Sequence, residues 1–366
     1  MKAIVVSDFR DEGVKYLTFS NKDGKKWSIP VQNIRTGLEV YGPSGLRGKL
    51  LKKWLPMTPV LRFLKKIIRG TYTTVQLSEE LKRVINASFG NDWECSVFWG
   101  TPCVDQKITI QIFDNKKILG YCKIGSSERA RELFQHEKKV LDILEQRECP
   151  HVSRCLALEE IEEGYWVFVQ STEKKVGSKN GQGYGKRQKN FLDALWNGTK
   201  QNMRFEETDY YHSITFLKEH ITSISSEFRQ SVYTCVSEMI AMYQGQMVEW
   251  GITHRDFTPW NTCVVNDSLF VFDFEYALLN APSGLDRWHY FFQSQYYEEK
   301  YDEYSILREY YKNIKDEKDV TSSICYLVDI ISLYLLRGEE GDIAIANQRA
   351  KLLNLILENN KVEDAK

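Results

Sequence analysis

The sequence predicts an α+β protein of two lobes, in which a strand-rich N-terminal part precedes a mainly helical C-terminal part. Residues 93–125 and 155–170 contain short runs with strand periodicity, joined by tight turns. Between them, residues 128–146 have the apolar spacing of an amphipathic helix. From about residue 211 the pattern is mostly helical, apart from a compact stretch at 253–275. Strands followed by helices are typical of an α+β fold, and a cleft between two lobes is a common place for a ligand.

Length and charge limit the classes of function. The chain has 366 residues, of which 42% are hydrophobic, so it can bury a sizeable core and is long enough for about two domains. Forty-nine Lys and Arg residues balance fifty Asp and Glu residues. Because this balance leaves no overall positive field, we expect no nucleic-acid partner.

Cysteine usage and hydropathy predict a cytoplasmic protein. The eight cysteines are scattered without a CxxC pair, which indicates a reducing compartment and neither a disulfide framework nor a zinc site. Charged residues interrupt the first 13 positions before any long apolar core, so no secretory signal is predicted. The most apolar run, Tyr326–Leu336, is short for a membrane span and contains Asp329.

We expect three segments along the chain. Residues 1–90 form an N-terminal extension of short strands and basic amphipathic helices, residues 91–172 an N-terminal lobe of strands with one helix, and residues 173–366 a mainly helical C-terminal lobe. The strands of the extension are predicted at Ala3–Val6, Tyr16–Phe19, Trp27–Val31 and Leu38–Tyr41.

Two stretches are strongly basic. Residues 43–70 contain eight Lys and Arg residues and no acid, and a basic amphipathic helix is predicted between Pro59 and Gly70. This stretch either contacts an anionic membrane or glycolipid, which would place the protein at the inner face of the membrane, or packs on the N-terminal lobe with a solvated rim. Residues 173–190, rich in Gly, Lys and Asn, are predicted to be a loop that either clamps an acidic acceptor or is a plain linker.

Polar residues at 254–275 form the strongest chemical signal. Two β-rich runs flank an Asn266–Asp267–Ser268 turn, which predicts a hairpin. Folding it about Asp267 brings Asn261 and Asp273 together at its open end, with Asp256 one short loop further back. Two carboxylates and a carboxamide suit Mg²⁺, which keeps water and substrate phosphates as its other ligands.

A second signal comes from Lys123 and Glu137. The helix predicted at 128–146 has Glu137 on its apolar stripe, where a carboxylate is costly unless it is paired. The preceding strand offers Lys123, which stands in an otherwise apolar run. Either the two side chains form an ion pair from strand to helix, or each extends to solvent.

These residues resemble the protein-kinase-like fold, and specifically its aminoglycoside phosphotransferase/choline kinase branch. The run HRDFTPWN and the later FDFEYA are similar to bacterial phosphotransferase-family proteins that accompany surface-polysaccharide biosynthesis. A kinase of this fold pairs a strand Lys with a helix Glu and uses a catalytic Asp, an Asn and a metal-binding Asp. The matching positions are Lys123, Glu137, Asp256, Asn261 and Asp273.

The resemblance implies a bilobal enzyme with an antiparallel-sheet N-lobe that uses ATP and Mg²⁺ to phosphorylate a small-molecule or saccharide hydroxyl. Asp256 would orient or deprotonate that hydroxyl, and His254 and Arg255 would brace its loop. Asn261 and Asp273 would hold Mg²⁺, while Lys123, positioned by Glu137, would contact the α- and β-phosphates. These effects are alignment and charge neutralisation rather than covalent catalysis.

Further roles are less specific, and of these only the adenine contact is implied by the resemblance. Glu275 is either a further metal ligand or a strand-end charge, and Asp286 is expected to cap a helix rather than to face the acceptor. Backbone groups of Val169, Gln170 and Ser171 would meet adenine. Trp260 either stacks on a sugar or belongs to the core.

The sequence departs from a protein kinase in three places. The segment 96–103, which should cover the phosphates, has the single glycine Gly100 and no GxGxxG motif. Asp273 is not followed by Phe–Gly, and no A-P-E triplet closes an activation segment. A nucleotide-binding pseudokinase that acts as a scaffold in glycan assembly is therefore one alternative, and a protein kinase is a weaker one.

Overall fold

The computed structural model describes residues 3–10, 12–43, 45–57, 66, 68–103, 105–161, 164–339 and 341–363. The chain forms two compact units. Unit 1 comprises Met1–Gln146, His151–Asn180 and Cys263–Glu275, and unit 2 comprises Arg147–Pro150, Gly181–Thr262 and Tyr276–Lys366. The boundaries of these units differ from those of the three predicted segments. The N-terminal extension and the 263–275 hairpin both belong to unit 1, together with the predicted N-terminal lobe.

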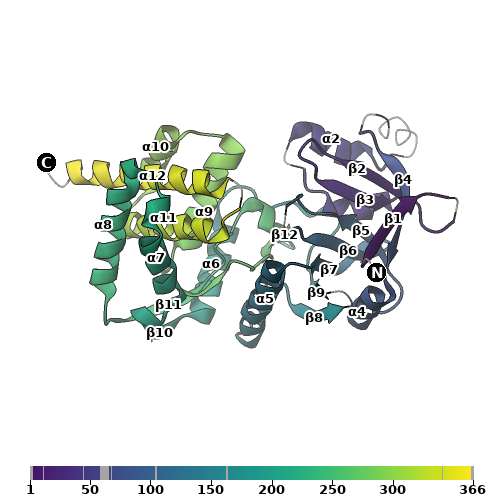
Figure 1. The fold of residues 1–366 in the computed structure, drawn as a ribbon, viewed down its shortest axis with the longest axis horizontal. Helices are drawn as coiled ribbons and strands as arrows, with labels where there is room; N and C mark the ends of the chain where they lie inside the picture. Colours follow the sequence, from purple (N-terminus) through teal and green to yellow (C-terminus); the bar gives the residue numbers. More distant parts are fainter. Residues whose placement is uncertain are drawn as a thin grey trace. The chain divides into compact units, whose positions relative to one another are not determined.

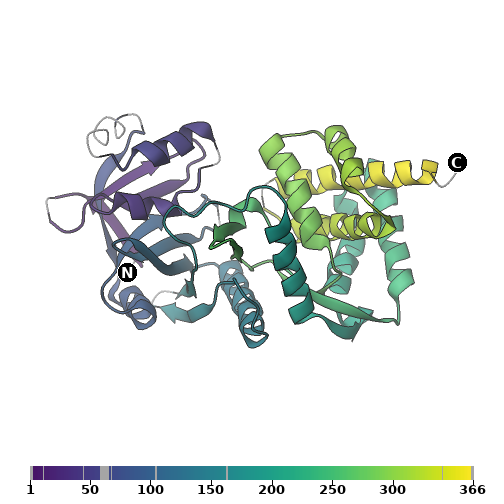
Figure 2. The same ribbon diagram turned by 180° about the vertical axis from the view of Figure 1, so that it is seen from behind.

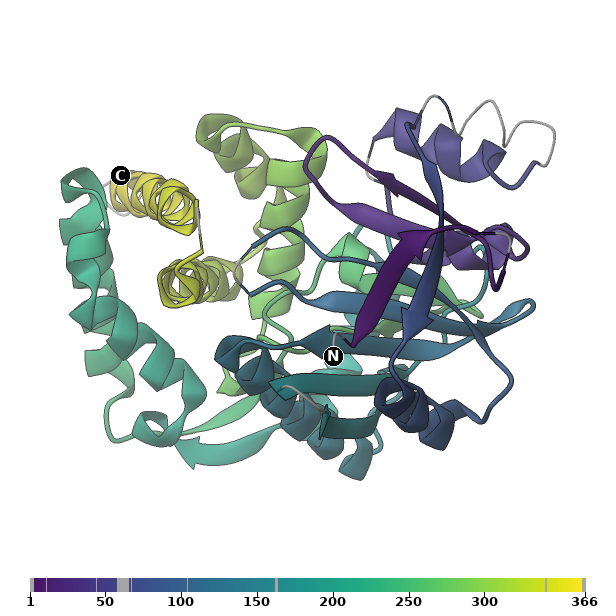
Figure 3. The same ribbon diagram turned by 45° about the vertical axis from the view of Figure 1, so that its right-hand side comes forward.

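Unit 1 is built on one antiparallel sheet, which is curled (Figure 3). Its nine strands follow the order β1-β4-β2-β3-β5-β6-β7-β9-β8. The bounds are β1 (Ile4–Asp8), β2 (Tyr16–Ser20), β3 (Lys26–Pro30), β4 (Thr71–Leu77), β5 (Glu94–Phe98), β6 (Ile108–Asp114), β7 (Lys117–Gly125), β8 (Cys155–Ile161) and β9 (Tyr165–Ser171). Pairing of β3 with β5, with Trp27 opposite Phe98, makes the N-terminal extension continuous with the sheet of the lobe.

Two long helices accompany this sheet. The helix α4 (Glu79–Phe89) contacts β8 and β9, and its first turn is capped by the Ser78 hydroxyl, which accepts from Leu81 N. The helix α5 (Glu128–Gln146) matches the predicted helix, and it buries Ala130, Phe134 and Val140 on the predicted stripe. Both helices are visible beside the strands in Figure 1. The strands β5, β6, β7 and β9 bury an aliphatic core on the same sheet.

The prediction of a strand at Leu38–Tyr41 is wrong. That segment follows α1 (Ile34–Gly37) and begins with the 3₁₀ turn η1 (Leu38–Val40). The turn is compact because Gly37 lies against the sheet: a Cβ at this residue would approach Ser96 Oγ to 2.6 Å. Leu38 then enters the core beside Leu17 and Ile29, so tertiary packing decides the local structure.

The basic stretch contains one described helix, α2 (Leu46–Trp54). Residues 58–65 and 67 lie outside the described residues, and so does most of the helix predicted between Pro59 and Gly70. On α2, Leu51 packs partly against the core, and Lys52 forms an ion pair with Glu39 at 3.1 Å.

Unit 2 is mainly helical, as predicted, with a three-stranded sheet of order β10-β11-β14. Its main elements are α6 (Lys186–Thr199), β10 (Gln201–Arg204), α7 (Asp209–Glu219), α8 (Ser226–Tyr243), β11 (Met247–Thr253), β14 (Leu278–Ala281), α9 (Leu285–Gln293), α10 (Glu303–Asn313), α11 (Glu317–Arg337) and α12 (Asp342–Glu363). The helices α11 and α12 pack side by side, drawn in yellow-green and yellow in Figure 2.

The helix α11 is the one described helix that is long and apolar enough to cross a membrane by length and composition. Its segment from Cys325 to Tyr334 is buried in the core of unit 2. Burial of this kind is typical of the central helix of a helical core, which passes the same test.

The loop predicted at 173–190 is only partly a loop. The helix α6 already begins at Lys186, so that Lys186, Arg187 and Lys189 are helical. Gln188 accepts a hydrogen bond from Gly185 N at 3.1 Å and donates one to Gly181 O at 2.8 Å, which stabilises the first turn. The Gly-rich sequence before this turn favours a loop, so the start of the helix was not predicted.

Candidate active site

A hairpin of β12 (Thr262–Val265) and β13 (Ser268–Val271) precedes Asp273, as predicted. Asn266 and Asp267 have φ values of 47° and 65°, the left-handed conformation that a two-residue hairpin turn requires. Asp273 itself has a φ of 74°. The chain therefore turns shortly after the strand, and the Asp273 carboxylate contacts Lys123 of β7.

The predicted ion pair between Lys123 and Glu137 is present in unit 1. Lys123 Nζ lies 2.7 Å from Glu137 Oε2 and also 2.7 Å from Asp273 Oδ1. Glu137 is fully buried, so its charge is tolerable only because Lys123 compensates it. The strand β7, the helix α5 and the end of the hairpin are thus joined by one ammonium group.

The charged groups of this cluster shift one another's pKa values. Burial alone would lower the pKa of Lys123, but the carboxylates of Asp273 and Glu137 outweigh it and raise the pKa well above its usual value. Burial raises the pKa of Glu137, and the Lys123 charge opposes that rise. Glu275 extends the cluster, because its Oε2 lies 2.5 Å from Lys107 Nζ.

The carboxylates of this cluster fit a hard divalent cation. Oxygen atoms of Glu137, Asp273 and Glu275 lie within 4.8 Å of one another. The second oxygen of Glu137, Oε1, is buried and has no hydrogen-bond partner among the residues that the structure describes. Asp273, with about a third of its side chain exposed, is the more accessible ligand, and Glu275 is next to it. One or two carboxylates beside phosphate oxygens are the usual protein share of a Mg²⁺ site.

Asp256 and Asn261 form a second cluster, in unit 2. Asn261 Nδ2 donates to Asp256 Oδ2 at 2.7 Å, and His289 Nε2 lies 3.2 Å from Asp256 Oδ1. His289 lies on α9 and is buried, whereas 32% of the Asp256 side chain is exposed. The carboxylate is therefore held through both oxygens and is still open to a substrate. His289 was not found from the sequence.

The loop that carries Asp256 is fixed by two buried carboxylates. Arg255 has a φ of 64°, and its guanidinium bonds Asp329 through Nε and Nη2, both at 2.9 Å. Asp286 accepts from His254 N at 2.7 Å and from Arg255 N at 2.9 Å. The expectation that Asp286 caps its own helix is wrong, because both oxygens bond the backbone of this loop.

Three residues expected to contact the nucleotide form part of the turns and strands of unit 1. Gly100 has a φ of 79°, and a Cβ there would meet Lys107 O at 2.2 Å, so the turn between β5 and β6 requires glycine. Val169 is buried in β9 between β7 and β8. Ser171 N donates to Arg154 O at 2.9 Å. Contacts of these residues with a nucleotide stay predictions.

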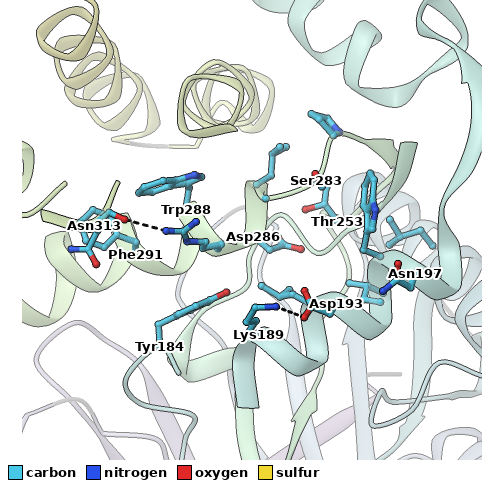
Figure 4. Close-up of a pocket in the computed structure, with 18 of the residues that line it drawn as sticks. Tyr184, Lys189, Asp193, Asn197, Thr253, Ser283, Asp286, Trp288, Phe291 and Asn313 are labelled. Atoms are coloured by element: carbon cyan, nitrogen blue, oxygen red, sulfur yellow. Dashed lines mark hydrogen bonds and ion pairs between the residues drawn. The ribbon is translucent and has the colours of Figure 1, made fainter. Parts of the chain in front are cut away.

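A cavity of about 680 Å³ opens in unit 2 beside Asp286 (Figure 4). Several of its charged side chains are paired, since Lys189 bonds Asp193 and Arg287 bonds Asp319. Asp256 and Asn261 do not line it. The cavity is lined by Asp286, which supports the Asp256 loop, but not by Asp256 itself. The exposed carboxylate of Asp256 is therefore the better candidate for a catalytic group. That the Asp256 and Lys123 clusters act together stays a prediction.

Comparisons with known proteins identify the fold. No family model matches the chain, and no curated protein matches its sequence. Two solved structures of a thermostable aminoglycoside phosphotransferase, each with AMP-PNP and hygromycin B, are similar to this chain at 12% identity and a TM-score of 0.51. Each match covers 76% of this chain, and 99% or 98% of the other. A choline kinase from Cryptosporidium parvum matches at 11% identity and a TM-score of 0.49, over 75% of this chain and 90% of that one.

The chain has a protein-kinase-like fold of the α+β class, as predicted. The curled antiparallel sheet and the mainly helical second unit correspond to the two lobes of that fold. At this level of identity the likeness concerns the fold alone, so an activity has to be argued from the site residues.

Proposed function

We propose that the protein is an ATP- and Mg²⁺-dependent phosphotransferase that moves the γ-phosphate to a hydroxyl group of a small molecule or saccharide. The observation that carries this proposal is the buried ammonium of Lys123, which bonds both Glu137 and Asp273 at 2.7 Å. In kinases a strand Lys is likewise paired with a helix Glu, beside an Asp that binds the metal ion. The bound AMP-PNP and hygromycin B of the two similar structures are consistent with a nucleotide and a small-molecule acceptor.

Each residue has a defined part in the proposed reaction. Lys123 binds phosphate oxygens and is kept in place by Glu137. Asp256 accepts the proton of the acceptor hydroxyl on its carboxylate, which Asn261 and His289 hold in one orientation. Asp273 and Glu275 would hold Mg²⁺, with Asn261 as a further ligand, and the ion neutralises charge on the phosphates when bound.

A transfer assay tests the proposal. Purified protein is incubated with ATP and Mg²⁺ and with a panel of sugars, glycolipid precursors and aminoglycosides, and the products are analysed by mass spectrometry. We expect one acceptor class to gain a phosphoryl group in an ATP-dependent way. Stabilisation by Mg·ATP without transfer to any acceptor would favour the scaffold alternative, and transfer to generic protein substrates would favour a protein kinase.

Asp286 is expected to act as a positioning residue. In Asp286→Asn one of the two loop N–H groups loses its acceptor, so the Asp256 loop is less well placed. We expect kcat to fall roughly 10- to 100-fold, while the Kd for Mg·ATP changes little. The control Asp319→Asn alters the carboxylate that pairs with the neighbouring Arg287. Equal losses of kcat in both variants, or a loss of Mg·ATP binding, would contradict the positioning role.

We also propose that the acceptor is a saccharide or glycolipid of surface-polysaccharide biosynthesis, and that α2 brings the protein to an anionic membrane. Leu46, Leu50 and Trp54 follow one another at helical spacing and are 80%, 56% and 49% exposed. Arg47, Lys49 and Lys53 are exposed on the same helix, and residues 45–57 contain no acid. A Trp-containing apolar stripe flanked by cations is complementary to anionic lipid.

Vesicle flotation checks this surface. We expect wild-type protein to bind vesicles of phosphatidylcholine with phosphatidylglycerol, and Leu50→Gln and Trp54→Gln each to weaken binding by about tenfold or more. Leu336→Gln, which removes an exposed leucine of α11, is the matched control and should bind like wild type. Binding to pure phosphatidylcholine that equals binding to anionic vesicles would contradict the electrostatic part of the proposal.

A further inference from the structure

Arg349 carries a buried charge that forms no ion pair with a carboxylate in the described part of the chain. This residue of α12 is fully buried, and its Nε and Nη1 atoms have no hydrogen-bond partner among the described residues. Its guanidinium lies over the ring of Tyr296, 3.4 Å from the centroid. Among the described residues, none forms an ion pair with it, and the ionisable groups that face it are the hydroxyls of Tyr296, Tyr297, Tyr326 and Tyr334.

These tyrosines cannot neutralise the charge. Burial raises the pKa of Tyr296 and of Tyr326, so both hydroxyls stay protonated at neutral pH. An arginine remains charged under all such conditions. A buried cation without a counter-ion is strongly unfavourable, whereas an anion bound beside it would satisfy the idle N–H groups.

A pocket of about 500 Å³ lies beside this buried arginine, which is one of its lining residues. It is lined by Tyr296, Tyr297, Lys300, Tyr301, Gln348 and Arg349. Two acids also border it, but both are engaged: Asp302 accepts from Ser305 N at 2.8 Å, and Glu303 pairs with Lys351 at 3.1 Å. Lys300 is exposed and forms no ion pair with a described residue, so it adds a second cation.

The pocket is next to the loop that holds Asp256. The Tyr297 ring meets the ring of Trp260 edge to face, with centroids 6.1 Å apart, and Trp260 directly precedes Asn261. Trp260, Tyr297 and Tyr301 are 41%, 50% and 40% exposed, so Trp260 is not a core residue. Exposed aromatic rings beside a polar pocket provide apolar faces against which a sugar ring can pack.

We infer that this pocket binds an anionic substituent, a phosphate or a carboxylate, of a saccharide acceptor, with Arg349 and Lys300 as its ligands. The inference rests on the proposed phosphotransferase function and names the acceptor class. Trp260 and the tyrosines that line the pocket would hold the sugar, so that one of its hydroxyls reaches the carboxylate of Asp256 while the anionic group is fixed at Arg349.

Binding and transfer are measured separately. Asp256→Asn protein is titrated calorimetrically with glucose 1-phosphate, glucuronate and glucose, which share a ring and differ in the anionic group. We expect at least one anionic sugar to bind roughly tenfold or more tightly than glucose. Which of the two binds better distinguishes phosphate from carboxylate. The rates of ATP-dependent transfer to the same three sugars are then measured with the wild-type protein.

Substitutions in the Asp256→Asn background assign the preference to the pocket. Arg349→Gln should reduce the preference for the anionic sugar by about tenfold or more, and Lys300→Gln should reduce it severalfold. Lys300 is at the surface, so that variant serves even if Arg349→Gln fails to fold. Arg308→Gln removes an exposed cation of α10 and should leave the preference unchanged.

The outcomes separate the two proposals. Equal binding of the three sugars, or an anion preference that survives in Lys300→Gln and in folded Arg349→Gln, would overturn the inference. Binding that depends on Arg349 without transfer by the wild-type protein would support the pocket and refute the phosphotransferase function. Transfer that is fastest to an anionic sugar would support both.

Discussion

Asp256→Asn is expected to lower kcat by about 100- to 10,000-fold while Mg·ATP still binds, because a carboxamide has the same size as the carboxylate but cannot accept a proton. The change is nearly isosteric, and Asn261 and His289 remain in place to hold the side chain. The Lys123 cluster belongs to unit 1 and is not altered. Initial rates with the best acceptor, together with a thermal shift by Mg·ATP, measure the two properties independently.

The comparison for this variant is Asp193→Asn, which neutralises a carboxylate on α6 that pairs with Lys189. It removes the same charge from the same unit and should retain the wild-type rate. Retained turnover in Asp256→Asn would exclude Asp256 as the base. A parallel loss of Mg·ATP stabilisation would instead assign Asp256 to nucleotide or metal binding.

The Lys123–Glu137 pair could be predicted because its signal is local. A helical stripe that is apolar except for one carboxylate needs a cation, and in the adjacent strand Lys123 stands within the apolar run, whereas Lys117 stands at its exposed start. The hairpin before Asp273 was predictable for the same reason, since Asn266 and Asp267 tolerate the left-handed backbone of its turn.

The support of the Asp256 loop was not predicted, because its partners come from distant helices. Asp286 and Asp329 lie 31 and 74 residues beyond Arg255, and no periodicity relates them to the loop. Asp329 did carry a usable signal, since it interrupts the apolar run of α11 as Glu137 interrupts that of α5. A buried carboxylate needs a cation, and in the structure Arg255 is that cation.

Lys123→Met is expected to destabilise the protein by about 3–5 kcal/mol at neutral pH, because it leaves the fully buried carboxylate of Glu137 without a cation. Urea unfolding measures the loss. Lys82→Met breaks the exposed pair of Lys82 with Glu79 and should cost less than about 1 kcal/mol. A loss in Lys123→Met as small as that of the control would mean that Glu137 is not held by Lys123.

The pH dependence of the Lys123→Met variant identifies the group responsible. Burial raises the pKa of Glu137 from 4.5 to about 7 even with Lys123 present, and removing the cation raises it further. A carboxyl with a raised pKa binds its proton more tightly in the folded state, so stability falls as the pH rises from about 4.5 through the folded pKa. We therefore expect the variant to lose more stability than wild type between pH 5 and pH 8.

Adding Glu137→Gln to Lys123→Met tests that assignment, because the double variant has neither the buried carboxylate nor its cation. Its free energy of unfolding at pH 8 should exceed that of Lys123→Met, and the extra slope between pH 5 and pH 8 should disappear. A steep slope that persists in the double variant would show that Glu137 is not the group responsible for it. In the folded protein Lys123 therefore serves stability and the proposed phosphate contact with one ammonium group, since the carboxylates that keep it charged also position it.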